Sequence, residues 1–570
     1  MKENTTNQKS RLEYFKALLE SARHAAAERD EVFERNMKQY LGSSEIDGGE
    51  CASMVRNITY EIIESEISSD IPVPKVDVLS YSEEREKRAA SIERLCATVR
   101  DMIPFDELND LDERYTYVYG ASIWYVEWNQ DENDGGARVY CISPRDFLGQ
   151  PGITDVNDMD YCFLTFTTTR DELVRRYAVS REESDRAEFE YKYGSEDGSD
   201  TAKVVVCFYR DEDGEIGRFV FSGELSLADT PKFYKRKGMV CKKCHAPEGE
   251  CKCGAGYEVG DIESERLISQ GGEIIVPYFT PKSFPIVIRK NTRSGDSLYG
   301  ISDCDMIRHQ QQAINKVESR IMQKLMRSGI TPIMPEDSSV TLGNSIFGQV
   351  IKMRPGESAS SYGKIDTTPD ISQDVIEANR LYDQAKRIIG ISDALQGLDS
   401  GKIESGYAKE LKIAQSAGRL EAKRRMKNFA YSEIYRLIFE HYLAFADKAR
   451  ELSYKDGLGN VHTEQFDRTS FVELDGGAYI YRGDYYFSVD DGGGEAYKRE
   501  ALWQRNLENL QSGTLGDQSS PKTLLRYWQS QEKARYPFAR DNVEYFKEII
   551  LNEKSNNKES ENENERRNES

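Results

Sequence analysis

Four cysteines lie close together in the segment CKKCHAPEGECKC, which covers residues 241–253. They form a Cys-x-x-Cys pair and a Cys-x-Cys pair, and they are Cys241, Cys244, Cys251 and Cys253. Thiolates in two such pairs can close a tetrahedral zinc site, and residues 247–249 can turn the chain between the pairs. Four thiolates leave no open position for water, so such a zinc would be structural. The sequence therefore predicts a structural zinc that staples residues 232–258.

The alternative for this segment is four reduced thiols with no metal. The six residues between the two pairs make a short connection for an ordinary zinc ribbon. His245 is a substitute ligand if one cysteine fails to reach the ion. Neighbouring lysines, such as Lys242, Lys243 and Lys252, would offset the negative charge of a four-thiolate site. Both readings stay open at the level of sequence.

Motifs for catalysis are missing from the chain. It contains no GxxxxGK[ST], no HExxH and no GxSxG pattern. The histidines available are His24, His245, His309, His441 and His462. The acidic pair Asp490 and Asp491 stands beside three glycines, which is typical of a solvated turn. We therefore expect no catalytic residue and no enzymatic activity.

Composition indicates a folded chain with a very polar surface. Hydrophobic residues make up 38% of the 570 residues, which is enough for a sizeable core and three or four structural regions. Charged residues reach 31%, and the mean hydropathy is −0.68. No run approaches the length of a membrane span, and the opening MKENTTNQKSRLEYF lacks the apolar core of a signal peptide. A soluble protein made inside the cell is the expectation.

The formal net charge of −22 limits the kinds of partner. A broad grip on nucleic acid needs clustered Lys and Arg, so this charge argues against it. It is compatible with a channel through which DNA slides, because an acidic wall repels the phosphate backbone.

Hydrophobic periodicity predicts a mixed α+β architecture. Helices are expected over residues 11–40, 51–67, 82–102 and 105–119, and strands over residues 121–128, 137–142 and 161–168. Asp213 and Gly214 suit the turn of a hairpin between VVVCFYR and GRFVFS. The other cysteines stand in apolar or periodic contexts typical of reduced buried thiols, and they are Cys51, Cys96, Cys141, Cys162, Cys207 and Cys304.

Two long helices with narrow apolar stripes follow. The first runs from about residue 303 to 325, where Ser302 or Asp303 can cap it, and its other faces are too polar for a core. The second runs to Gly390 after the N-terminal signal Thr368-Pro369-Asp370. Because both stripes are narrow, we expect an antiparallel pair that completes its burial against neighbouring subunits. An ordinary helical hairpin within one domain is the alternative.

A longer helix and a helical C-terminal region complete the chain. A glycine-punctuated loop leads into a helical pattern from about residue 407 to 450. Its basic run Lys423-Arg424-Arg425 is either a solvated face or a site of phosphate contact or subunit pairing. Residues 495–551 are expected to be helical with a break before Pro521, and the low-complexity tail 552–570 is expected to be disordered.

Taken in order, these elements resemble the portal proteins of tailed bacteriophages. The resemblance covers nearly the whole chain. It is carried by YVYGASIWYVEW, by VYCISPRDFLGQPGITDVNDMDYCFLTF, by SLYGISDCDMIRHQQQAIN at the first long helix, and by GISDALQGLDSGKIESGYA before the longest one. None of these is an invariant signature, and the order of the elements carries more weight than any single motif.

The resemblance implies a portal-like division of the chain. Residues 1–300 would form a wing region, 301–327 and 369–390 the stem helices, 328–368 the clip, 391–406 a tunnel loop, 407–494 the long helix with further wing strands, and 495–551 a helical crown. It also implies a homo-oligomeric ring of about twelve chains at one capsid vertex of the virion. Zinc is not a general property of the family, so the cysteine cluster is a departure from it.

The implied partners are the terminase large subunit, the major capsid and scaffolding proteins, a head-tail adaptor, and double-stranded DNA held without sequence preference. The tunnel loop would face the DNA with Ser392, Asp393, Gln396, Asp399, Lys402 and Ser405. The stem would contact neighbouring subunits through Ile314, Val317, Ile321, Val375 and Tyr382. Two other classes remain open, namely a zinc-stabilised nucleic-acid enzyme of unrecognised type and another head-tail structural protein.

Overall fold

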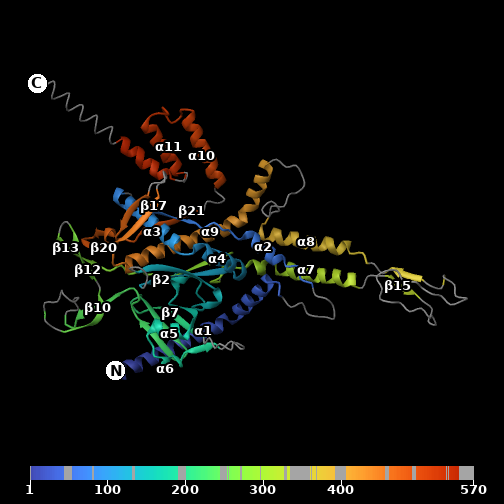
Figure 1. The fold of residues 1–570 in the computed structure, drawn as a ribbon, viewed down its shortest axis with the longest axis horizontal. Coiled ribbons are helices and arrows are strands. Elements are labelled where there is room, and N and C mark those ends of the chain that lie inside the picture. Colours follow the sequence, from blue (N-terminus) through green and yellow to red (C-terminus); the bar gives the residue numbers. More distant parts are fainter. Residues whose placement is uncertain are drawn as a thin grey trace. The chain divides into compact units, whose positions relative to one another are not determined.

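A computed structural model describes the chain in segments. They are residues 2–43, 54–79, 82–130, 135–190, 201–243, 253, 256–262, 264–269, 272–295, 297–326, 330–333, 360, 363–366, 369–391, 406–455, 461–490, 496–533, 536 and 538–550. The chain divides into unit 1, Met1–Asp30 with Ile67–Ile301 and Ala417–Ser570, and unit 2, Glu31–Glu66 with Ser302–Ser416. Helices and strands occur in both, so the fold belongs to the mixed α+β class (Figure 1).

The first helices agree with the prediction at some ends and differ at others, because the predicted starts at residues 11 and 51 are wrong. Their bounds are Lys2–Tyr40 for α1, Ile58–Glu66 for α2, Glu83–Met102 for α3 and Phe105–Tyr119 for α4. Ser82 caps α3, because its Oγ accepts a hydrogen bond from the Arg85 backbone N–H at 3.2 Å. Helix α4 has the predicted bounds and ends at Gly120, whose φ of 88° is a left-handed conformation that favours glycine.

A three-stranded antiparallel sheet forms the centre of the main core in unit 1. Its order is β14-β2-β3, with β2 at Ala121–Asn129, β3 at Gly136–Ile142 and β14 at Ile286–Lys290. The first six residues of β2 are buried. Within this core, the fully buried Trp124 lies 6.2 Å from Phe105 of α4 and 5.4 Å from Tyr431, between ring centroids.

A second, six-stranded sheet packs against α1. Its order is β4-β5-β7-β8-β9 with β6 also paired to β7, and its strands are β4 Phe147–Gly149, β5 Tyr161–Thr169, β6 Glu188–Glu190, β7 Thr201–Arg210, β8 Ile216–Ser222 and β9 Leu225–Thr230. The turn before β8 confirms the predicted hairpin, and Gly214 has a φ of 77° there. Phe15 of α1 stacks on Phe219, with ring centroids 4.7 Å apart. Helices α5 (Arg170–Tyr177) and α6 (Arg181–Ser184) connect β5 to β6.

Two-stranded antiparallel sheets make up the rest of unit 1's strands. The pairs are β1 (Val73–Val78) with β21 (Tyr485–Asp490), β10 (Arg236–Cys241) with β11 (Tyr257–Ile262), β12 (Ser264–Ser269) with β13 (Gly272–Pro277), β17 (Arg450–Lys455) with β18 (Val461–Phe466), and β19 (Val472–Asp475) with β20 (Ala478–Tyr481). Among the described residues of unit 1, 3-10 turns lie at Pro144–Asp146, Val156–Asp158 and Arg468–Phe471.

Gly300, just before the first long helix, occupies a position that a side chain cannot share. A Cβ atom there would lie 2.6 Å from the carbonyl oxygen of Gly120 and 2.8 Å from that of Thr292. Both neighbours are backbone atoms of the sheet region, which cannot move aside cheaply. The glycine is therefore required by close packing of backbone on backbone.

Unit 2 contains the predicted helix pair. Helix α7 covers Asp303–Met326 and α8 covers Ser372–Ile389, with strands β15 (Ile330–Ile333) and β16 (Gly363–Asp366) paired antiparallel between them in sequence. Ser302 Oγ accepts the Asp305 backbone N–H at 3.0 Å, which confirms the expected cap of α7. The predicted start of α8 is wrong by a few residues, because its N-cap is Ile371, while Asp370 Oδ1 accepts the Ser372 N–H at 2.8 Å.

The longest helix, α9, covers Gly406–Phe445. Its last third is buried on most sides, including Tyr431, Ile434, Ile438 and His441. Phe429 of the same helix is 55% exposed, although its neighbour Ala430 is buried. Helices α10 (Ala496–Gln511) and α11 (Pro521–Lys533) and a helical run at 539–550 follow, and α11 starts at the proline as expected.

Candidate functional site

Helices α7 and α8 lie side by side in an antiparallel arrangement (Figure 1). Ile307 near the start of α7 belongs to the same apolar cluster as Ile389 at the end of α8. Lys324 near the end of α7 contacts Asp374 near the start of α8. The expected antiparallel pair is therefore present within one chain.

A third helix covers part of this pair, which the sequence analysis did not anticipate. Ile58 and Ile62 of α2 pack in the same cluster as Ile314, and all three side chains are fully buried. Val317 is also buried, at 8% exposure. The expectation that Ile314 and Val317 face a neighbouring subunit is corrected accordingly, because residues of the same chain already cover them.

Polar groups join α2 to α7 as well. Gln311 is 3% exposed, although its polarity suggested a surface position. Its Oε1 accepts hydrogen bonds from the Thr59 backbone N–H and hydroxyl, each at 3.0 Å, and its Nε2 donates to the Arg56 carbonyl and to Asn315 Oδ1, each at 2.8 Å. Every polar atom of this amide is paired, which is why it can be buried. The start of α2 therefore fixes the rotation of α7.

At the opposite end of the pair, a carboxylate joins the two helices. Asp374 of α8 accepts from Lys324 Nζ at 2.5 Å and forms an ion pair with Arg320 at 2.5 Å. The hydrogen bond from Lys324, together with that from Arg320, lowers the pKa of Asp374. Both cations come from one face of α7, so this contact sets the register between α7 and α8.

Exposed apolar side chains gather at the same end of the pair. Leu325 and Met326 of α7 are 46% and 68% exposed, and Val375 and Ile376 of α8 are 41% and 59% exposed. We call these four residues the end patch. Large apolar side chains clustered on a surface mark sites of association more often than isolated ones do.

Of the other predicted interface residues, some are partly covered by the same chain and one is exposed. Ile321 is half-buried and Val375 lies in the end patch. Tyr382 is half-buried and engaged within the chain, because its hydroxyl donates to Glu61 of α2 and the Arg56 guanidinium lies 5.2 Å from its ring centre. A tyrosine held by α2 is not available as a free contact.

The predicted tunnel-loop residues, from Ser392 to Ser405, lie outside the described part of the chain. So do Cys244, Cys251 and Cys51. Within the described residues, no group of three or more potential metal ligands was found. Of the other cysteines, Cys96, Cys162, Cys207 and Cys304 are buried as expected, and Cys141 is half-buried.

A buried charge cluster, which the sequence analysis missed, joins α4, β14 and α9 in unit 1. It consists of Asp112, Glu113, Arg289 and Lys427. Arg289 Nη1 donates to Asp112 and, at 2.8 Å, to Glu113 Oε1, which Lys427 Nζ also contacts at 2.9 Å. Asp112 in addition accepts from the Trp124 indole N–H at 2.8 Å. All four side chains are at most 6% exposed.

The charges of this cluster shift the acidity of Glu113. Burial alone would raise its pKa, but Arg289 and Lys427 outweigh that effect and lower the pKa to about 2. Lys427 also donates to the Asp70 carbonyl at 2.8 Å. The cluster therefore holds the buried part of α9 against α4, with Glu113 ionised at neutral pH.

The basic run on α9 is only partly a surface feature. Lys423 is 7% exposed, and its Nζ lies 5.0 Å from the ring centre of Tyr117 on α4. Arg425 is exposed and lies 3.7 Å from Glu421, one turn earlier. The predicted phosphate contact is therefore not available to Lys423, whose charge is used inside the protein.

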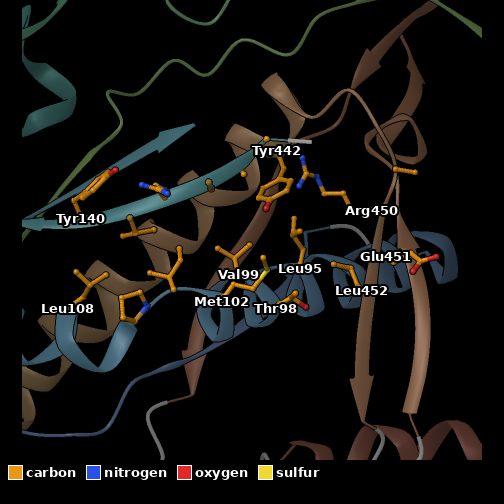
Figure 2. Close-up of a pocket in the computed structure, with 18 residues that line it drawn as sticks. Leu95, Thr98, Val99, Met102, Leu108, Tyr140, Tyr442, Arg450, Glu451 and Leu452 are labelled. Carbon is orange, nitrogen blue, oxygen red and sulfur yellow. The ribbon is translucent and has the colours of Figure 1, made fainter. Parts of the chain in front are cut away.

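A cavity of about 1060 Å³ opens between α3, β3 and β17 (Figure 2). Figure 2 shows Leu95, Val99 and Met102 of α3 along it, with Tyr442 and Arg450 above them in this view. Its lining is mainly apolar, and the Arg450 guanidinium lies 5.0 Å from the Tyr442 ring centre. None of the described residues of this lining is a histidine or a cysteine. The lining also carries the charged side chains of Arg138, Arg450 and Glu451.

Comparison with known proteins does not assign this chain to a family. No protein-family model matches the chain, and no curated protein matches it. Among solved structures, it is similar to a chain of the "Neck of empty GTA particle computed with C6 symmetry", with a TM-score of 0.36 and 11% sequence identity over 83% of this chain and 90% of that one. A likeness at this TM-score carries no argument about fold or function. In the described segments, no helix is long and apolar enough to cross a membrane.

Proposed function

We propose that this chain is the subunit of a phage portal, a ring through which double-stranded DNA enters and leaves the capsid. The observation that carries the proposal is the order of elements from α7 to α9 along the chain. Two antiparallel helices, α7 and α8, bracket an inserted segment whose strands β15 and β16 pair with each other, and the 40-residue helix α9 follows. A stem pair around a clip and before a long tunnel helix is the arrangement that the sequence resemblance implies.

The end patch is the surface of the stem that this function needs. Residues of the same chain already cover the middle of the pair through α2, so neighbouring subunits would meet at Met326, Val375 and Ile376 instead. Charged residues such as Arg320 and Arg380, both 56% exposed, stand near the patch and would form its polar rim. A second copy of this chain is the proposed partner.

The role of such a ring is structural. It would nucleate capsid assembly with scaffolding and major capsid proteins, dock the terminase large subunit, and later hold a head-tail adaptor. ATP hydrolysis would belong to the terminase, in keeping with a sequence that lacks a phosphate-binding loop motif. On this proposal residues 391–406 line the channel as the tunnel loop, and the protein resides at the capsid vertex of the virion.

The proposal is tested by the mass and shape of the purified protein. Mass photometry should show a species of about twelve chains, and top views in negative stain should show closed rings with a central hole. A protein that stays monomeric across salt, magnesium and concentration series would contradict the proposal. ATPase or nuclease activity that copurifies with the chain would instead favour the nucleic-acid enzyme.

A variant pair separates the end patch from general stability. Ile376→Asp should abolish rings, because a buried, unpaired carboxylate at each contact costs on the order of 2 kcal/mol or more. The isolated chain should fold normally, since this side chain is 59% exposed. Leu474→Asp is the matched control, because Leu474 is 62% exposed on β19 in unit 1. Rings that survive Ile376→Asp would place the subunit contact elsewhere.

A further inference from the structure

The hairpin of β10 and β11 brings two of the clustered cysteines together. Cys241 ends β10 and pairs with Tyr257 of β11, and beyond this pair the Lys242 N–H donates to the Gly256 carbonyl at 3.0 Å. Cys253 lies four residues before Tyr257. Its Sγ is 3.2 Å from the Cys241 Sγ. Two sulfur atoms that are twelve residues apart in sequence therefore converge at the end of a two-stranded sheet.

The backbone also contacts one of these sulfurs. The Lys243 N–H donates to the Cys241 Sγ at 3.4 Å, and the Cys241 side chain is fully buried. A cysteine sulfur binds metal as the thiolate, which can accept such a backbone hydrogen bond while it is bound to the ion.

The distance between the two sulfur atoms distinguishes a disulfide from a pair of zinc ligands. A disulfide holds its sulfurs about 2.05 Å apart, so Cys241 and Cys253 are not joined by one. Two thiolates on a tetrahedral zinc lie at about 2.3 Å from the ion and hence roughly 3.8 Å from each other. A shift of about half an ångström would bring this pair to that spacing.

We propose that Cys241 and Cys253 are two ligands of a structural zinc ion that closes the β10–β11 hairpin. The sequence supplies Cys244 and Cys251 as the remaining thiols, and both lie outside the described residues. Each thiol releases its proton to solvent as the ion binds, so affinity rises with pH. The site goes beyond the portal function, which needs no metal.

A bound zinc would stabilise the β10–β11 hairpin. A two-stranded sheet is at best marginally stable by itself. Met239 of β10 and Val259 of β11 are 41% and 71% exposed, while Val240 is buried, so only part of the hairpin's apolar surface is covered. Zinc would add to this small core at the end of the sheet, as metals do in small domains.

The test measures metal binding to the full-length, reduced protein. After removal of metal with a chelator and exchange into chelator-free buffer, Zn²⁺ alone and Co²⁺ alone are titrated. We expect about one ion per chain, and thiolate-to-cobalt charge-transfer absorption with the visible bands of a tetrahedral site. Cys253→Ser should weaken Co²⁺ binding at least about tenfold. It should still fold, because Cys253 is exposed.

Cys141→Ser is the matched control, since Cys141 is a half-buried cysteine of β3 outside the cluster. It should bind Co²⁺ as the wild type does. Absence of stoichiometric binding by the reduced wild type would overturn the proposal. So would equal affinities of the Cys253→Ser and Cys141→Ser variants, or a native mass lower by two hydrogens that shows a disulfide. Ring formation is scored on the same samples, and loss of zinc without loss of rings leaves the portal proposal standing.

Discussion

Replacing Arg289 with methionine tests whether the buried charge cluster holds α9 against α4. Methionine replaces the aliphatic stem of Arg289 with another unbranched chain. It removes the guanidinium that Asp112 and Glu113 share. Asp112 would retain its neutral donor Trp124, and Glu113 would retain Lys427. The two buried carboxylates would then face one cation instead of two.

The structure sets the size of the effect. The pKa of Glu113 falls from 4.5 to about 2, which corresponds to about 3 kcal/mol of stability at neutral pH. Removing one partner of a buried ion pair costs about 3–5 kcal/mol in other proteins. We therefore expect Arg289→Met to lower the free energy of unfolding of unit 1 by about 3 kcal/mol or more. Arg175→Met, at a guanidinium that is 83% exposed, should change it by less than about 0.5 kcal/mol.

Urea unfolding followed by tryptophan fluorescence measures both variants, because Trp124 contacts the cluster directly. Equal midpoints for Arg289→Met and Arg175→Met would refute the reasoning. The pH dependence gives a second readout. A carboxyl with a lowered pKa adds stability above its unfolded value of about 4.3 and loses it as the pH falls toward 2. The variant Glu113→Gln should therefore flatten the wild-type loss of stability in that range.

The remaining predictions concern single positions elsewhere. His441 is buried, and desolvation lowers its pKa to about 4. The stability that its neutral form provides is therefore lost as the pH falls from about 6.5 to 4. His441→Phe should remove this pH dependence of stability in the same urea assay. Gly300→Ala should destabilise unit 1 by about 2 kcal/mol or more, seen as a lower urea midpoint, because the new Cβ would lie 2.6 Å from a backbone oxygen. Lys324→Met should raise the pKa of Asp374 toward its ordinary value, measured by carboxyl NMR titration; the stability from this pair is present above pH about 4 and lost below it. An unchanged Asp374 titration would show that Arg320 alone sets it. Deleting residues 398–403 should leave rings intact and reduce the length or retention of packaged DNA, and normal packaging would show that this loop neither grips nor gates.

Local signals in the sequence were enough to place many elements of unit 1, the start of α7 and the end of α8. Helix α4 occupies the predicted residues 105–119, and the predicted Ser302 cap is present. The hairpin turn at Gly214 is also where it was expected. These features depend on hydrogen bonds and backbone angles within a few residues, so their causes are adjacent in the chain. Among the candidate sites, only the cysteine cluster could be recognised from local sequence, because the spacing of its four cysteines is itself a local feature.

Burial was decided by contacts that no local pattern reveals. The apolar stripe of α7 predicted a subunit interface, yet α2, some 250 residues earlier, covers Ile314 and accepts the polar Gln311 into the interior. Arg289 meets Glu113 across 176 residues of sequence. An apolar stripe on a helix indicates only that this face is shielded from water. The same stripe is expected whether the face is covered by the same chain or by a neighbouring subunit. The amino-acid sequence thus determined which helices form and some of their ends, while the tertiary structure alone decided which of their faces remain for a partner.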